Sequence, residues 1–213
     1  MRFKEYIESG IRLPKGSVET VAGSIIKPSN FCSNMHILNP SDMHHLRAAE
    51  GWLDLGNLNE SRSELELIPS PQRNHPKVLE LWWNLSAKEK NWKNCVKTAQ
   101  LLIESAPDQP AGWIHRSFAL HELNQTEEAF TQLEPAQNLF SDQWVIPYNL
   151  ACYLSQLGRI KEAAQQFESA LSIDSKAVKM AAATDPDLKP LRLSLIHISE
   201  PTRPERIAVG GGC

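Results

Sequence analysis

The sequence repeats itself with a period of 34 residues, and this period constrains the fold more than any other feature. Like residues align over four consecutive units, which span residues 42–75, 76–109, 110–143 and 144–177. One column is small in every unit, as expected where two helices approach closely, and holds Ser61, Cys95, Ala129 and Ala163. One helical turn further along the same face stand Leu65, Ala99, Leu133 and Phe167. The period therefore predicts two helices in each unit.

Further columns complete the pattern. The stripe of the second helix continues with Ile68, Leu102, Ala136 and Ala170. The first helix carries its own stripe, formed by Ala48, Trp82, Arg116 and Leu150 and then by Trp52, Ser86, Leu120 and Leu154. Between the two helices stand Gly56, Lys90, Asn124 and Gly158, and Gly and Asn suit a left-handed helix C-cap. The pattern predicts an all-α fold, a right-handed α-solenoid that buries its core between successive helix-turn-helix units.

One segment carries the strongest family resemblance. Residues Tyr148-Asn149-Leu150-Ala151-Cys152-Tyr153, followed by Leu157-Gly158-Arg159-Ile160-Lys161-Glu162-Ala163, resemble the tetratricopeptide repeat family. The resemblance extends, as a match of period, over about residues 42–177. Two residues depart from the family pattern. Trp83 stands where the family usually has a small residue, and Pro135 should kink or shorten the second helix of its unit.

The ends of the chain lie outside the repeat. Residues 1–41 fit no repeat column, and we expect an irregular or disordered segment, or a misassigned start, there. Residues 178–192 begin as a helix and break at Asp185-Pro186, so we expect them to cap the open face of the last unit. Residues 193–203 resemble one reading frame of a transposase adapter used in sequencing libraries. We therefore expect 193–213 to be an artefactual tail, the alternative being a genuine flexible tail.

Charge and composition exclude several classes of partner. The 22 Lys and Arg residues nearly balance the 25 Asp and Glu residues, which leaves no electrostatic surplus for nucleic acid. Apolar runs fall well short of the roughly 20 residues that span a bilayer, so we expect no membrane segment. The dispersed cysteines form no CxxC pair, and no leader-like apolar run follows the first Met. We expect reduced thiols in a bacterial, cytoplasmic protein.

Signals for catalysis, metals and cofactors are weak. His44 and His45 are adjacent, and neighbours on a helix point about 100° apart, so we expect no metal site. Cys95 lies in the small core column, and no base can be assigned to Cys152, so we expect no catalytic thiol. Motifs for hydrolases, nucleotide binding and zinc proteases are missing from the sequence, and we expect neither enzymatic activity nor a cofactor. Packing should account for most tryptophans, of which four fall on core columns: Trp52, Trp82, Trp92 and Trp113.

The resemblance implies a concave groove, lined by the first helices, that binds an extended or helical peptide. The matching columns predict a lining of Leu46, Glu50, Glu80, Asn84, Ile114, Phe118, His121, Tyr148 and Cys152. Among these, Ile114, Phe118 and Tyr148 are the expected apolar anchors. An alternative is that the lining packs against the capping helix or the N-terminal segment. A chaperone-type carboxylate clamp is disfavoured, because Leu46 and Glu80 stand where the family would place lysines.

The leading hypothesis is thus a non-enzymatic scaffold or adaptor that binds a peptide or helix of a partner protein in the groove. The first alternative is a structural or self-associating fragment of a larger tetratricopeptide assembly. The second is a secretion-type chaperone that shields an apolar export substrate. The sequence does not decide among the three, and it names no partner.

Overall fold

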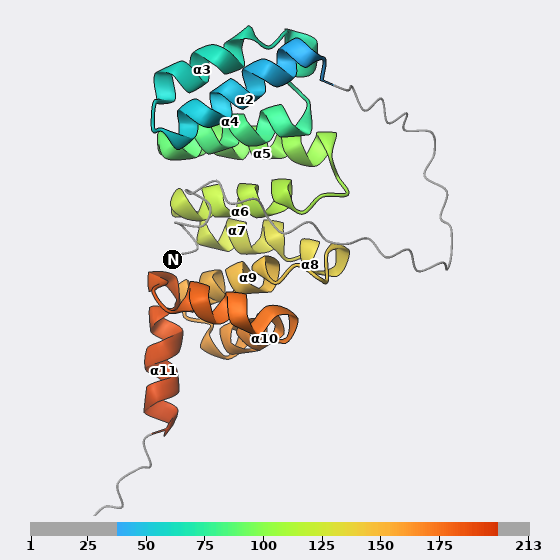
Figure 1. The fold of residues 1–213 in the computed structure, drawn as a ribbon. Helices are drawn as coiled ribbons and strands as arrows, with labels where there is room; N and C mark the ends of the chain where they lie inside the picture. The colour runs from blue at the N-terminus through green and yellow to red at the C-terminus, as the bar shows by residue number, and fades with distance from the viewer. Residues whose placement is uncertain (1–37, 200–213) are drawn as a thin grey trace, which may run out of the picture.

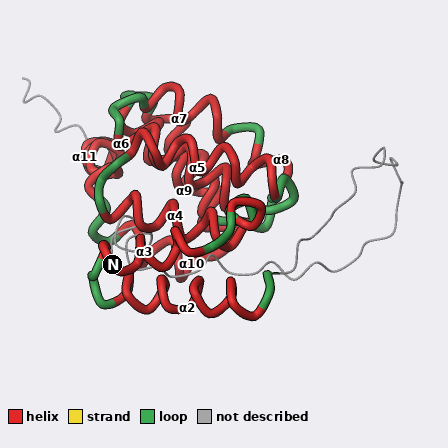
Figure 2. The backbone as a smooth tube through the Cα atoms, turned by 90° about the horizontal axis from the view of Figure 1, so that it is seen from above, coloured by secondary structure: helices red, strands yellow, loops and turns green. Residues whose placement is uncertain are grey.

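The computed structural model describes residues 38–199. Within them every secondary-structure element is a helix, and short loops connect the helices (Figure 2). The α-helices are α2 (Pro40–Asp54), α3 (Leu58–Leu67), α4 (Pro76–Lys88), α5 (Trp92–Ser105), α6 (Ala111–Glu122), α7 (Thr126–Leu133), α8 (Ala136–Leu139), α9 (Val145–Gln156), α10 (Ile160–Ala182) and α11 (Lys189–Ser199). Two short 3-10 helices are η1 (Ser70–Gln72) and η2 (Pro186–Leu188).

The helices stack in chain order, from α2 and α3 at one end to α10 and α11 at the other (Figure 1). Consecutive helices pack in pairs: α2 with α3, α4 with α5, α6 with α7, and α9 with α10. Each pair also contacts the next pair through α3 and α4, α5 and α6, or α7 and α9. Almost all packing is therefore between neighbours along the chain, and the predicted all-α solenoid is confirmed.

Four turns share one backbone conformation. Gly56, Lys90, Asn124 and Gly158, which end the four first helices, all have positive φ, between 57° and 77°. In the first of these turns the N–H of Gly56 donates to the carbonyl of Leu53, and the N–H of Asn57 donates to that of Trp52. The other three turns repeat both hydrogen bonds, which together define a Schellman motif. The turn column read from the sequence is thus a left-handed cap in every unit, even where Lys90 occupies it.

The two helices of each pair meet at a column of small side chains on the second helix. The column Ser61, Cys95, Ala129 and Ala163 is fully buried. Opposite it lies a first-helix column that the sequence analysis did not single out, and its members are also fully buried: Ala49, Trp83, Ser117 and Ala151. The Ser61 hydroxyl donates to the Ala49 carbonyl at 2.8 Å, and the Cys95 thiol approaches the Trp83 carbonyl at 3.8 Å. These bonds give the short polar side chains a partner inside the core.

The expectation for the tryptophans is wrong in part. Trp52 is 37% exposed, and Trp82, Trp92 and Trp113 are only half-buried. Trp83, which stands where the family usually has a small residue, is instead fully buried. For Trp82 and Trp83 the reason is a one-residue offset. The predicted column through Ala48 and Trp82 lies at the edge of the helix interface, and the next residue points into it.

Pro135 has the effect expected of it. Helix α7 ends at Leu133, and the short helix α8 begins at Ala136 after a break. A proline inside a helix removes one backbone hydrogen bond and clashes with the preceding turn, which explains the break. The second helix of this unit is therefore shorter than its counterparts α5 and α10.

The C-terminal part of the chain bends back on the stack. Helix α10 runs through the proposed boundary at 177/178, with a kink at Asp174, where φ is −144° and ψ is 87°. It ends at Ala182, and η2 and α11 follow, so the helix breaks close to Asp185-Pro186 as expected. Helix α11 continues to Ser199, into the stretch expected to be artefactual. Residues 1–37 and 200–213, and with them most of the expectations for the two ends, lie outside the described residues.

Buried apolar side chains form two clusters that share helix α4. The N-terminal cluster extends from Leu38 to Leu85. The C-terminal cluster extends from Trp83 to Leu191. Leu81 and Leu85 of α4 belong to the first cluster, whereas Trp83 and Ala87 belong to the second. No helix within residues 38–199 is both long enough and apolar enough to cross a membrane.

Candidate peptide-binding groove

The predicted groove residues come from the first helix of each pair. Leu46 and Glu50 lie on α2, and Glu80 and Asn84 lie on α4. Helix α6 carries Ile114, Phe118 and His121, and helix α9 carries Tyr148 and Cys152.

Burial divides the predicted lining into two groups. Leu46, Ile114, Phe118, Tyr148 and Cys152 are buried. The polar members Glu50, Glu80, Asn84 and His121 are half-buried. The expected apolar anchors are thus packed against other side chains in this structure and do not present an open apolar surface.

Aromatic packing explains the burial of Phe118. Its ring lies edge-on to Trp83 at 6.3 Å and to Trp92 at 5.8 Å, measured between ring centroids. Both geometries are favourable for aromatic pairs. Phe118 therefore contributes to the contact between α6 and the preceding pair.

His115, on the same helix, is buried in an apolar environment. Its ring stacks on that of Trp83 at a centroid distance of 4.0 Å and an interplanar angle of 13°. Neither ring nitrogen has a hydrogen-bond partner. Burial therefore lowers the pKa of His115 to about 4, because the charged imidazolium would lose its hydration.

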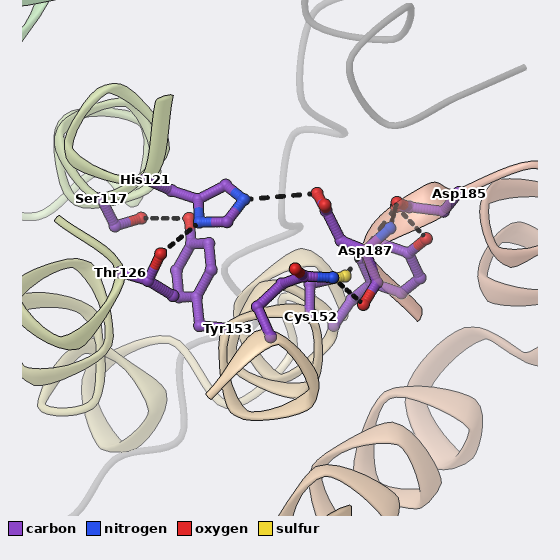
Figure 3. Close-up of polar contacts among 9 residues, drawn as sticks. Ser117, His121, Thr126, Cys152, Tyr153, Asp185 and Asp187 are labelled. Carbon is purple, nitrogen blue, oxygen red and sulfur yellow. Dashed lines mark hydrogen bonds and ion pairs between the residues drawn. The ribbon is translucent and has the colours of Figure 1, made fainter. Parts of the chain in front are cut away.

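Tyr148 is covered by the chain that follows α10. The Tyr148 hydroxyl donates a hydrogen bond to Oδ2 of Asp185 at 2.7 Å. The Cys152 thiol lies 3.8 Å from the same oxygen (Figure 3). Asp185 is only 4% exposed, and burial raises the pKa of its carboxyl group. The carboxylate of Asp185 is therefore held by two donors of α9 in a site shielded from water.

A second carboxylate lies beside His121. Oδ2 of Asp187 is 3.4 Å from Nε2 of His121, and Nδ1 of His121 is 3.0 Å from the hydroxyl of Thr126 (Figure 3). The imidazole also packs against the ring of Tyr153, with 5.0 Å between centroids. The Tyr153 hydroxyl donates to Oγ of Ser117 at 3.2 Å and so ties α9 to α6. These contacts fix the His121 ring at the junction of the third and fourth helix pairs.

Two further contacts involve the backbone of the same C-terminal segment. The side-chain amide of Gln156 donates through Nε2 to the backbone carbonyl of Asp187 at 2.8 Å. The Leu191 N–H donates to Oγ of Ser155 at 3.3 Å. Leu188 and Leu191 are buried, with no more than 2% of either residue's surface exposed. We refer to residues 185–191 as the C-terminal strap. The strap covers the face of α9 on which the predicted groove residues Tyr148 and Cys152 lie.

The structure thus adds residues that sequence reasoning missed: Ser117, Tyr153, Gln156, Asp185 and Asp187. Asp185 has a local role that the sequence could have signalled. Its Oδ1 accepts from the Asp187 N–H at 3.0 Å, a helix-capping bond typical of Asp before Pro. The contact of Asp185 with Tyr148 spans 37 residues, and no local signal indicates it.

Within the described residues, Cys95 and Cys152 are unsuited to nucleophilic chemistry. Burial raises the pKa of Cys95 to about 12. Burial, together with the nearby Asp185 and Asp187 carboxylates, raises the pKa of the Cys152 thiol as well. Since the thiolate is the nucleophile, both groups remain in the unreactive form at neutral pH. Residues 38–194 also contain no group of three His, Cys, Asp or Glu side chains arranged to hold a metal ion.

Comparisons with known proteins agree with this fold. The sequence profile described as Tetratricopeptide repeat matches residues 148–177, which cover most of α9 and the first part of α10. Among solved structures, MamA MSR-1 C2 is similar with a TM-score of 0.55 and 18% identity, over 64% of this chain and 78% of that chain. A MamA mutant is similar with a TM-score of 0.51 and 19% identity, over 61% and 76%. No curated protein sequence matches the chain.

Residues 148–177 therefore form a tetratricopeptide repeat, as the resemblance to the family implied. The fold of the chain is similar to that of MamA. Solenoids of this type serve in general as protein-interaction scaffolds, because stacking creates an extended curved surface.

Proposed function

We propose that this chain is a non-enzymatic adaptor that binds a peptide or helix of a partner protein on the surface formed by its first helices. In this proposal residues 42–75, 76–109, 110–143 and 144–177 are the repeat units, and 178–192 form the cap. The proposed contact residues are Leu46, Glu50, Glu80, Asn84, Ile114, Phe118, His121, Tyr148 and Cys152. The protein acts in the cytoplasm and requires no cofactor.

One observation carries the proposal. On α9 and α6, the predicted groove residues Tyr148 and His121 contact side chains of a segment of polypeptide, the C-terminal strap. The neighbouring residues Gln156 and Ser155 of α9 contact its backbone. Side-chain contacts give specificity in peptide recognition, and hydrogen bonds to the peptide backbone give affinity. The first-helix surface of this chain therefore has the chemistry needed to hold a peptide.

The burial of the lining decides which variants can test the proposal. Substitution of Ile114 or Phe118 by a charged residue would disrupt the core, because both side chains are at least 95% buried. Glu80 and Asn84 on α4 are half-buried and can be changed with less risk. Lys97 is exposed on the second helix α5 and provides a matched control outside the proposed groove.

The experiment begins with the selection of binders to the complete chain from a random peptide library. Dissociation constants are then measured by fluorescence anisotropy for Glu80→Lys, Asn84→Ala and the control Lys97→Glu, with folding checked by circular dichroism. We expect the two groove variants to weaken binding about tenfold or more, and the control to leave it unchanged. Equal effects of the groove and control variants would contradict the proposed surface. A stable oligomer without any peptide binder would favour the self-associating alternative.

A further inference from the structure

The C-terminal strap makes the contacts of a bound ligand with α6 and α9. Its two carboxylates are each met by side chains of the groove, Asp185 by Tyr148 and Asp187 by His121. Its backbone forms hydrogen bonds with the side chains of Gln156 and Ser155. Because an apolar cap needs only buried side chains, this set of polar contacts exceeds what covering the end of a solenoid requires.

The side of the groove that faces the strap is rich in hydrogen-bond donors. Tyr148, Cys152 and Gln156 donate toward the strap. His121 can donate through Nε2, since its Nδ1 can accept from the hydroxyl of Thr126. Carboxylates accept hydrogen bonds, so an acidic peptide matches this surface. Basic side chains at the two positions would leave Tyr148 and His121 without these acceptors.

The apolar part of the strap completes the match. Leu188 follows Asp187 directly and is 1% exposed, in the same cluster as the α9 core. Arg192 lies just beyond the strap and donates to the carbonyls of Ala182 and Asp185, which stabilises the bend that brings the strap back to α9. The exposed residues Ala183 and Thr184 connect this bend to α10 and offer a place for it to open.

We propose that His121, Tyr148, Cys152, Ser155 and Gln156 form a receptor for an acidic peptide of the form Asp-x-Asp-Leu, which the chain's own strap fills in the absence of a partner. A partner that carries such a segment binds by displacing the strap. This inference rests on the proposed groove function and specifies the chemistry of its ligand. The strap is then both a cap for the fourth helix pair and a competitor that sets a threshold for binding.

The test supplies the ligand in trans to the complete chain. The probe is a fluorescein-labelled synthetic peptide with the sequence of residues 183–192, and the matched control peptide carries Asp185→Asn and Asp187→Asn. Each peptide is titrated against the unaltered chain and against a strap-released variant with Asp185→Ala and Leu188→Ala. We expect the acidic peptide to bind the released variant at least about tenfold more tightly than it binds the unaltered chain. The control peptide should bind the released variant at least about tenfold more weakly than the acidic peptide.

Further measurements keep the test decisive if the released variant is unstable. A ligand that binds only the folded state raises the melting temperature, so the acidic peptide should restore part of the lost stability and the control peptide should not. His121→Ala in the released variant should remove the part of the discrimination that Asp187 contributes and leave the part that depends on Asp185 and Tyr148. A released variant that neither binds nor is stabilised by the acidic peptide would overturn the inference, as would equal binding of both peptides.

The outcome is separable from that of the proposed function. If peptides selected from the library bind beside Glu80 and Asn84 while the acidic peptide fails to bind the released variant, the adaptor function stands and the acidic receptor is wrong. If neither kind of peptide binds, both proposals fail.

Discussion

The two halves of the solenoid share the same helix-turn-helix backbone, but their buried side chains differ. The N-terminal cluster, from Leu38 to Leu85, consists of buried Leu, Ile, Val and Ala side chains. The C-terminal cluster contains buried aromatic rings, among them Trp83, Tyr148 and Tyr153. Buried polar groups such as His115 and Asp185 accompany these rings. The difference teaches that the repeat specifies helices and turns, whereas the choice of buried side chains differs between the two halves.

The aromatic core gives the largest expected effect. Trp83→Ala should lower the free energy of unfolding by about 3–5 kcal/mol, because it empties a fully buried site shared by α4, α5 and α6. Trp82→Ala, next in the chain, removes a half-buried ring that lies under the guanidinium of Arg62 and should cost no more than about 2 kcal/mol. Urea denaturation of both variants checks the difference. Equal losses would mean that the assignment of the interface column to residue 83 is wrong.

Acidic pH should lower the stability of the C-terminal half, which contains His115. The pKa of His115 is about 4 in the folded chain, below the ordinary value of 6.5, so the unfolded chain binds the proton more readily. The stability that depends on neutral His115 is fully present above pH 6.5 and is lost as pH falls toward and through 4. The linked loss amounts to about 3 kcal/mol. Denaturation midpoints from pH 7 to pH 4 should therefore fall more steeply for the parent than for His115→Leu. Parallel curves would refute the role of this histidine.

The strap contact should show a smaller but selective effect. Tyr148→Phe removes the donor to the buried Asp185 carboxyl and should cost about 1.5–3 kcal/mol, the range for hydrogen bonds to charged groups. Tyr153→Phe removes a neutral bond to Ser117 and should cost about 0.5–1.5 kcal/mol. Hydrogen exchange should accelerate in residues 185–191 for Tyr148→Phe and stay unchanged there for Tyr153→Phe. The same exchange pattern in both variants would argue against a specific anchor at Tyr148.

The turns should not distinguish the two halves. Gly56→Ala and Gly158→Ala place a side chain at φ of 77° and 75°, and each should cost about 1–2 kcal/mol. Thermal melts of the two variants should agree, since both turns form the same Schellman motif. A much larger effect at one turn would show that the backbone plan also differs between the halves.

The sequence predicted the second helices and turns well. The period placed Ser61, Cys95, Ala129 and Ala163 in the tightest column and positioned the left-handed caps, and both are local patterns repeated four times. On the first helices the same pattern was wrong by one residue, because it assigned the buried column to Trp82 and the structure buries Trp83. A first helix is packed between neighbours on both sides, so its apolar stripe is wide, and an offset of about 100° is hard to resolve by pattern.

The contacts of the proposed groove could be predicted from the sequence only in part. Repeat columns placed Tyr148 and Cys152 on the surface where the strap lies, which is consistent with the alternative that a capping segment covers them. The partners Asp185 and Asp187 could not be inferred. Their position depends on the kink at Asp174 and the bend after Ala182, which set the path of the chain without repeating any earlier unit.

The most direct test of the proposed groove is a hydrogen-exchange footprint of the complete chain with and without a selected peptide at saturation. The account predicts that protection concentrates on the first helices α2, α4, α6 and α9, and leaves α3, α5 and α7 unchanged. Protection confined to the second helices, or to the ends of the stack, would contradict the assignment of the binding surface.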